Sequence, residues 1–122
     1  MAFDGDAFVR RFIAVWDAHD LDAIEEMFTD DVLFETSIGP EAWGDRAVGR
    51  QAARALADQF FRRMPDAHYE LLRHFASPEL AVVESRTTGT HAGAPYDVHL
   101  VDLLTLRDGR IAAKRSYRKV KV

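Results

Sequence analysis

The amino-acid sequence predicts one α+β domain that spans residues 1–122. Most patterns with the helical period lie before Pro65, and patterns that alternate every second residue, separated by short turns, follow it. Helices followed by a run of strands are typical of the α+β class. With 122 residues, 48% of them apolar, the chain can bury one core and one ligand cavity, which excludes a second domain.

Two helices are expected at the start of the chain. Asp4 or Asp6 can cap the first, because apolar residues recur at helical spacing directly afterwards. After a break at residues 18–19, Asp20 can cap a short second helix, and a turn is expected at residues 30–31. The apolar stripes consist of Phe8, Val9, Phe12, Ile13 and Trp16 in the first helix and of Leu21, Ile24, Met27 and Phe28 in the second.

A strand, a loop and a third helix are expected next. From Val32 to Ile38 the side chains divide into two faces with a period of two, which predicts a strand. Residues 39–49 contain Pro40 and several glycines and are expected to form a loop. Apolar residues at helical spacing predict a third helix over residues 52–64, which Pro65 ends.

Four consecutive strands fill the rest of the chain. Short turns at residues 77–78, 92–93 and 108–109 separate them, which is typical of an antiparallel meander. If three helices cover one face, a strongly curved sheet leaves a pocket between the sheet and the helices. The expected strands are residues 67–76, 80–90, 96–106 and 110–120.

Composition excludes several classes of protein. The chain has no cysteine, which excludes disulfides, thiolate metal sites and thiol nucleophiles. A net charge of −4 disfavours binding to nucleic acid and anionic membranes. The longest apolar run, Phe12 to Trp16, is far too short to span a membrane, and the acidic start is unlike a signal peptide. We therefore expect a cytoplasmic protein.

The charge is unevenly distributed along the chain. Residues 1–31 contain nine Asp or Glu and two Arg, whereas residues 107–121 contain seven Lys or Arg and one Asp. The basic segment can lie beside the acidic N-terminal helices, as in most mixed-charge surfaces. The alternative is an anion-binding strip formed by Lys114, Arg115, Arg118 and Lys119.

Four motifs occur in an order and at distances that match a known superfamily. They are residues 16–24 (WDAHDLDAI), residues 27–32 (MFTDDV), Gly49 at the start of the third helix, and residues 106–111 (LRDGRI). With these motifs the chain resembles the nuclear transport factor 2-like superfamily, and within it the branch of SnoaL-like polyketide cyclases and ketosteroid isomerases. The resemblance covers nearly the whole chain, but it selects no reaction, because this fold hosts many activities.

The resemblance implies a cone-shaped, cystatin-like α+β barrel, in which a curved antiparallel sheet wraps round three N-terminal helices. It also implies an apolar cavity that opens near the loop after the first strand, and a homodimer formed through the outer face of the sheet. Ketosteroid isomerases use a general base, an oxyanion-hole tyrosine and a protonated acid. Those positions align here with Thr36, Phe12 and Asp102, so only the acid has a counterpart. Residues 114–119 also resemble the ending of uncharacterised SnoaL-like bacterial proteins.

Asp102 is the main candidate for chemistry, because it interrupts the apolar run at residues 100–104 of a predicted central strand. A buried carboxylate must find a partner or stay protonated. Lys114 lies opposite Asp102 if the preceding turn has three residues, and Arg115 does if it has two. A facing carboxylate and ammonium favour proton transfer, with Asp102 as base or acid and Lys114 stabilising an enolate oxygen. The alternative is an ion pair that only fixes strand register.

Two other residues are candidates for proton transfer. His74 lies in the middle of a predicted strand and can act as a general base. Glu84 interrupts an apolar strand as Asp102 does, so it can join Asp102 or pair across the sheet with Arg73 or Arg86. The predicted catalytic residues are therefore Asp102, Lys114, His74 and Glu84.

Large side chains near the expected cavity are candidates for substrate binding, although several of them can equally pack the core. Trp43 lies in a loop that contains glycine and proline, where a tryptophan can act as a lid. Arg86 can polarise a bound substrate. The predicted substrate-binding residues are Trp16, Trp43, Phe12, Phe34, Phe60, Arg86 and Tyr117.

These observations favour a cofactor-independent enzyme that isomerises, cyclises or dehydrates a small apolar carbonyl or polyketide-like compound. The sequence has no metal-ligand spacing, nucleophile elbow, phosphate loop or dinucleotide fingerprint, so we expect neither a metal nor a cofactor. The alternative is a non-catalytic domain that binds a small ligand or dimerises. The sheet face expected to form the dimer contains Val101, Leu103, Ile111, Ala113 and Tyr117.

Overall fold

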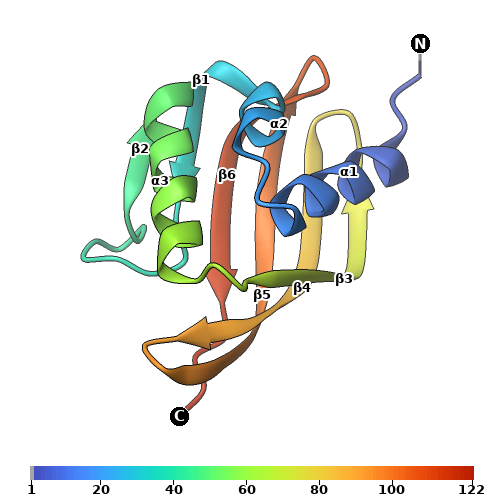
Figure 1. Cartoon of the computed structure of the whole chain (residues 1–122). Helices are drawn as coiled ribbons and strands as arrows, with labels where there is room; N and C mark the ends of the chain where they lie inside the picture. Colours follow the sequence, from blue (N-terminus) through green and yellow to red (C-terminus); the bar gives the residue numbers. More distant parts are fainter. Residues whose placement is uncertain (1) are drawn as a thin grey trace.

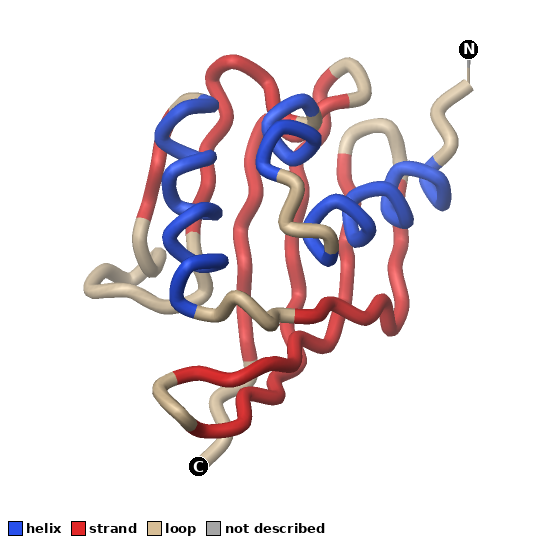
Figure 2. The backbone as a smooth tube through the Cα atoms, in the orientation of Figure 1, coloured by secondary structure: helices blue, strands red, loops and turns tan. Residues whose placement is uncertain are grey.

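The computed structural model describes residues 2–122 and confirms the α+β fold. Helices α1, α2 and α3 lie on one face of a six-stranded sheet (Figures 1 and 2). None of these helices is long and apolar enough to cross a membrane. The elements are α1 (Gly5–Asp17), α2 (Leu21–Glu26), β1 (Phe28–Glu35), β2 (Arg46–Val48), α3 (Arg50–Arg63), β3 (His68–Ala76), β4 (Leu80–His91), β5 (Ala94–Arg107) and β6 (Arg110–Arg118).

Side-chain caps begin the first two helices. Asp4 Oδ1 accepts a hydrogen bond of 3.0 Å from the backbone N–H of Ala7, so Asp4 is the cap of α1. Asp20 Oδ1 accepts from the N–H of Ala23 at 3.1 Å and begins α2 as predicted. Between the helices His19 adopts a left-handed conformation, with φ of 54°, and turns the chain.

The sheet is mixed rather than fully antiparallel. Its strand order is β2-β1-β6-β5-β4-β3, and the predicted meander of β3 to β6 is antiparallel throughout. Strand β1 instead runs parallel to β6. This pairing adds β1 and β2 to the sheet beyond β6. No local sequence pattern predicts it, because β1 and β6 lie far apart in the sequence.

Two local predictions were wrong around β1. The strand begins at Phe28 rather than at Val32, and Asp30 and Asp31 lie within it instead of forming a turn. Burial of Phe28 and Val32 in the core outweighs the turn preference of the two exposed aspartates. The predicted loop at residues 39–49 contains β2, which pairs with β1 but is too short to show alternation.

The core fills the space between the helices and the sheet. The end of β4 and the start of β5 bend round towards the α3 side, so the sheet is strongly curved (Figure 1). The inner face of the sheet and the apolar stripes of the helices meet in this concavity. The largest fully buried side chains include Phe12, Ile24, Phe28, Leu104 and Ile111.

The hairpin of β5 and β6 contains one extra residue that changes its register. Arg107 pairs with Arg110 across a two-residue turn, and Leu106 pairs with Ile111, yet Thr105 pairs with Ala113. Ala112 is therefore the additional residue of a β-bulge. Because the turn has two residues, Ile111 pairs with the buried Leu106 and is itself fully buried in the core, so its expected place on the outer sheet face was wrong.

Candidate functional site

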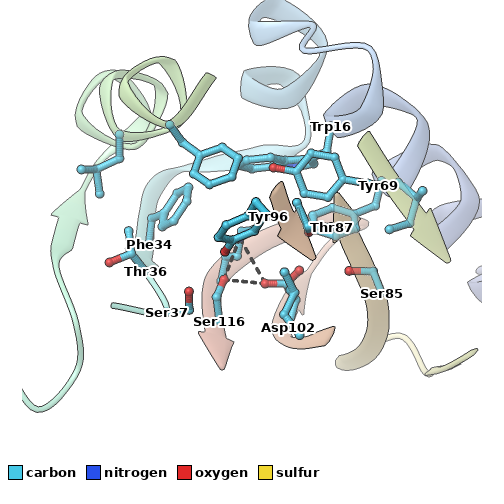
Figure 3. A pocket seen from close by; sticks show the side chains of 16 residues that line it. Trp16, Phe34, Thr36, Ser37, Tyr69, Ser85, Thr87, Tyr96, Asp102 and Ser116 are labelled. Atoms are coloured by element: carbon cyan, nitrogen blue, oxygen red, sulfur yellow. Dashed lines mark hydrogen bonds and ion pairs between the residues drawn. The ribbon is translucent and has the colours of Figure 1, made fainter. Parts of the chain in front are cut away.

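A cavity of about 90 Å³ lies between the helices and the curved sheet (Figure 3). This volume is well above the roughly 10–15 Å³ that one water molecule needs, and it suits a small organic molecule. Its helical side is apolar, whereas its sheet side carries most of its polar groups. The helical side is formed by Phe12, Ile13, Trp16, Leu56 and Phe60, and the sheet side contains Ser85, Thr87, Asp102, Lys114 and Ser116.

Asp102, Lys114 and Ser116 form a polar cluster on the sheet side of the cavity (Figure 3). Lys114 Nζ lies 3.1 Å from Asp102 Oδ1 and donates a hydrogen bond of 2.8 Å to Ser116 Oγ. The Ser116 hydroxyl in turn donates to Asp102 Oδ1 at 2.5 Å. The side chains of Lys114 and Asp102 are only 7% and 6% exposed, so this is a buried ion pair supported by a hydroxyl.

The register that produces this cluster differs from both alternatives considered above. Ser116, rather than Lys114 or Arg115, pairs with Asp102, and Lys114 pairs with Leu104. The bulge at Ala112 adds one residue to the register that a two-residue turn predicts. Because side chains two positions apart share a face, Lys114 reaches Asp102 diagonally across the two strands.

Two aromatic rings enclose the Lys114 ammonium group on its other sides. Nζ lies 4.6 Å from the centroid of the Trp16 ring and 4.5 Å from that of Phe34. These distances are typical of cation–π contacts, which are strongest where water is excluded. Trp16 on α1 and Phe34 on β1 thus hold the ammonium at the cavity wall, and both residues were predicted at the site.

The sequence analysis missed most hydroxyl residues of the cavity, among them Ser85, Thr87 and Tyr69. Ser85 and Thr87 take the inward positions of β4 that follow Ala81 and Val83. Tyr69 on β3 lines the same cavity, where burial and the negative charge of Asp102 raise its pKa well above the ordinary value of about 10. Alternation in β4 could have found Ser85 and Thr87, but nothing local marks Tyr69 as a cavity residue.

The structure brings six of the predicted site residues to the cavity. Asp102 and Lys114 provide the charges, and the four aromatic residues come from α1, β1 and α3. The tight packing of Trp16 against Phe12, Phe34 and Tyr69 shows that these rings serve the core and the cavity wall together. The six residues are Phe12, Trp16, Phe34, Phe60, Asp102 and Lys114.

Three predicted residues lie away from the cavity. Glu84 and Arg86 occupy the outward positions of β4, since Ser85 and Thr87 point inward, so Glu84 does not join Asp102. Glu84 accepts a 2.8 Å hydrogen bond from Arg73, which was the predicted alternative. Arg86 instead binds Asp97 through two hydrogen bonds of 2.8 and 2.7 Å. His74 faces α1, where its Nε2 lies 3.1 Å from Asp6 Oδ1.

Trp43 and Tyr117 line a second hollow of about 360 Å³ next to the cavity. Thr36, Ser37 and Ser116 line both spaces, so the two adjoin there. The Trp43 side chain stacks on the Arg46 guanidinium, 4.3 Å from the ring centroid, and it remains 43% exposed. Trp43 therefore lies beside the cavity rather than within it.

The basic residues of β6 do not form one strip. Lys114 points into the cavity, whereas Arg115 lies 3.4 Å from Glu35 Oε1. Arg118 donates a 2.8 Å hydrogen bond to the Tyr96 hydroxyl. Among residues 2–122, no three His, Cys, Asp or Glu side chains lie close enough together to hold a metal ion.

Comparison with known proteins agrees with this geometry. The model of the SnoaL-like domain family matches residues 9–114. A comparison with curated proteins found no match. The fold is an α+β cone, and the Asp102–Lys114 pair lies at its cavity, beneath the apolar side of the helices. Since the family model covers most of its length, the chain belongs to the SnoaL-like family.

Solved structures with the same fold come from several bacteria. A hypothetical protein with a ketosteroid isomerase-like fold from Catenulispora acidiphila, solved in complex with trimethylamine, is 18% identical, with a TM-score of 0.81 and coverage of 93% of this chain and 86% of that chain. An NTF2-like protein of unknown function from Mesorhizobium loti is 27% identical, with a TM-score of 0.78 and coverage of 95% and 91%. A candidate polyketide cyclase from Bacillus cereus is 22% identical, with a TM-score of 0.73 and coverage of 92% and 72%.

The names of matched structures cover different reactions. Besides the candidate cyclase they include a candidate ketosteroid isomerase and an epoxide hydrolase. Identities below 25% show the shared fold alone. The function of this chain must therefore be argued from its own cavity.

Proposed function

We propose that this protein is a cofactor-independent enzyme that transfers a proton to and from a small, largely apolar carbonyl compound. The observation that carries the proposal is the buried Asp102 carboxylate, which lies beside the Lys114 ammonium at the wall of an apolar cavity. A base and a hydrogen-bond donor held in a site that excludes water are what enolate chemistry needs.

The two oxygens of Asp102 have different surroundings. Both Lys114 and Ser116 contact Oδ1, so Oδ2 remains for a ligand. In the proposed reaction, Oδ2 takes a proton from the carbon next to the substrate carbonyl, and the C–H electron pair moves to form an enolate. Asp102 is then a neutral carboxylic acid that can return the proton.

Lys114 is placed to stabilise the enolate oxygen. An ammonium group has three N–H donors: one donates to Ser116 Oγ, and a second faces Asp102, whose Oδ1 lies 3.1 Å from Nζ. The third can donate to the substrate oxygen, where negative charge develops. Trp16 and Phe34 keep the ammonium group in position and exclude water from it.

One proton-transfer step serves three related outcomes. Return of the proton to a different carbon isomerises the substrate. Its delivery to a departing hydroxyl group on the next carbon releases water and completes a dehydration. Attack of the enolate carbon on a second carbonyl of the same molecule forms a ring, after which the proton goes to the new alkoxide.

The charge of Lys114 also restricts the ligand. The homologous structure from Catenulispora acidiphila holds trimethylamine, a small amine. In this chain the space between Trp16 and Phe34 already holds the protein's own ammonium group. A second cation there would be repelled, so we propose a neutral or anionic ligand.

A ligand panel tests the proposal. Cyclohexanone, acetophenone and phenol are added singly, and the shift of the thermal unfolding midpoint is measured for the wild type and for Asp102→Asn. We expect the oxygen-bearing rings to stabilise the wild type more than toluene does, and the variant to lose most of that difference. Equal stabilisation by toluene, or none by any compound, contradicts the proposal.

One observation favours a second candidate function, non-catalytic binding of a small ligand. Lys114 and Ser116 both contact the Asp102 carboxylate, which is the arrangement of an ion pair that only stabilises the strand register. For such a binding domain, the ligands would stabilise the protein without exchanging any proton with it. Measurement of proton exchange on the bound ketone separates the two functions.

A further inference from the structure

Two buried hydroxyl groups on the sheet side of the cavity take no part in the polar cluster. Ser85 and Thr87 are each 1% exposed and both line the cavity (Figure 3). Within residues 2–122, Ser85 Oγ and Thr87 Oγ1 are the buried side-chain polar atoms without a hydrogen-bond partner in the protein. A hydroxyl group removed from water without a partner destabilises the folded state. These groups therefore do not serve folding.

The register places both hydroxyls on the same face of the sheet as the polar cluster, on the strand next to Asp102. Val83 pairs with Asp102 and Ser85 pairs with Leu100, so Ser85 is a diagonal neighbour of Asp102 on the same face of the sheet. Such neighbours are roughly 7–8 Å apart between their Cα atoms. Thr87 is the next inward residue of β4 and pairs with Val98, so it lies one step further from Asp102 than Ser85 does.

Polar side chains thus occur on three neighbouring strands of the sheet, opposite the apolar side chains of the helices. They run from Lys114 and Ser116 on β6, through Asp102 on β5, to the hydroxyls of Ser85 and Thr87 on β4. The helical side opposite is apolar. A flat ligand that fills this space has one face against the helices, and it meets polar groups at two separated positions of the sheet.

We propose that Ser85 and Thr87 form a second polar subsite, which hydrogen-bonds an oxygen of the substrate other than the reacting carbonyl. The inference rests on the proposed function in one respect, since it places the carbonyl at Lys114. The substrate class is then a ring ketone, or an aryl ketone, that carries a hydroxyl or oxo group across the ring from the carbonyl. Either oxygen type fits, because serine and threonine hydroxyls both donate and accept.

The spacing also selects between isomers of such a ligand. An oxygen on the carbon next to the carbonyl would remain near Lys114 and Asp102, and would not reach β4. An oxygen two or three ring positions away extends towards Ser85 and Thr87. The subsite therefore prefers meta- and para-oxygenated rings to ortho-oxygenated ones.

Matched ligands and matched variants test the subsite by binding alone. The probes are 3′-hydroxyacetophenone and 3′-methylacetophenone, which differ by one hydroxyl in place of a methyl group. Dissociation constants are measured by calorimetry for the wild type, Ser85→Ala, Thr87→Val and the double variant. Thr88→Val is the control, because Thr88 is the next residue of β4 and takes the opposite face.

We expect the wild type to prefer the hydroxyl ligand by about tenfold, the value of one good hydrogen bond. The double variant should lose this preference and unfold at the same or a higher temperature, because it removes unpartnered hydroxyls. Thr88→Val should retain the preference. A wild type with no preference, or a double variant that keeps it, overturns the inference. A lower unfolding temperature with the preference retained assigns the hydroxyls a structural role and also overturns it.

The outcomes separate this inference from the proposed function. If the wild type exchanges protons with acetophenone but does not prefer the hydroxyl ligand, the subsite is refuted and the enzyme proposal stands. If the preference is present and depends on Ser85 and Thr87 while no proton is exchanged, the subsite is supported and catalysis is refuted.

Discussion

Lys114 Nζ lies 3.1 Å from Asp102 Oδ1, although neither residue is the backbone partner of the other. The contact is diagonal, and Ser116, which does pair with Asp102, hydrogen-bonds both side chains. With so little of either side chain exposed, each charge depends on the other for its stability in the folded protein.

Loss of one partner of this pair should therefore be costly, while loss of both should not. Lys114→Met leaves Asp102 as an uncompensated buried carboxylate and should reduce the free energy of unfolding by about 3–5 kcal/mol. The double variant Asp102→Leu with Lys114→Met replaces the pair by apolar groups and should be as stable as the wild type or more so. Urea unfolding measures both. A double variant that loses as much as the sum of the two single variants contradicts this interpretation of the pair.

Ser116 should stabilise the folded protein through the hydrogen bonds of its hydroxyl group rather than through the space that its side chain fills. Ser116→Ala removes hydrogen bonds to two charged groups and should destabilise the protein by at least about 1.5–3 kcal/mol, the value of one such bond. Ser116→Thr keeps a hydroxyl and serves as the matched control. Equal unfolding free energies for Ser116→Ala and the wild type would show that the bridge is energetically silent.

Tyr69 should make the protein sensitive to alkali. Burial raises its pKa in the folded state above the value of about 10 that it has when unfolded. Its contribution to stability is therefore fully present below pH 10 and is lost as the pH rises further, because only the unfolded state ionises. Relative to Tyr69→Phe, the wild type should lose up to about 1.4 kcal/mol per pH unit above 10. Denaturant unfolding of both proteins at pH 8 and pH 11 measures this difference, and an unchanged difference contradicts it.

A dimer through the outer sheet face remains a prediction. Phe75 and Tyr117 are 61% and 57% exposed there, and Leu80 is 41% exposed. Phe75 pairs with Val82, which in turn pairs with Leu103, so apolar residues extend over three strands of this face. Light scattering should find a dimer at micromolar concentration that Phe75→Lys dissociates, whereas Ile38→Lys, which changes an equally exposed residue in the loop after β1, should not affect it. A monomeric wild type at high concentration would refute the prediction.

Local patterns predicted most of the fold and about half of the site. The caps at Asp4 and Asp20 depend on residues close in sequence, and so do the apolar stripes that bring Phe12 and Trp16 to the cavity. Asp102 was found because it interrupts an apolar strand. Local rules suffice for features of this kind.

The remainder depends on register, which local patterns do not determine. The bulge at Ala112 changed the partner of Asp102 to Ser116, so the role of this serine could not be predicted. Glu84 interrupts its strand as Asp102 does, yet it points to the opposite face. The hydroxyls of Ser85 and Thr87 had meaning only after the cavity was seen.

The most direct test of the account is the exchange of carbon-bound protons of acetophenone in D₂O, followed by ¹H NMR. The wild type should accelerate deuterium incorporation into the methyl group next to the carbonyl. Asp102→Asn should lower that rate at least about 100-fold, the lower range for a general base. Asp97→Asn, which removes a carboxylate on the outer face, should keep it. Exchange no faster than in buffer, or equal exchange by Asp102→Asn and the wild type, would contradict the account.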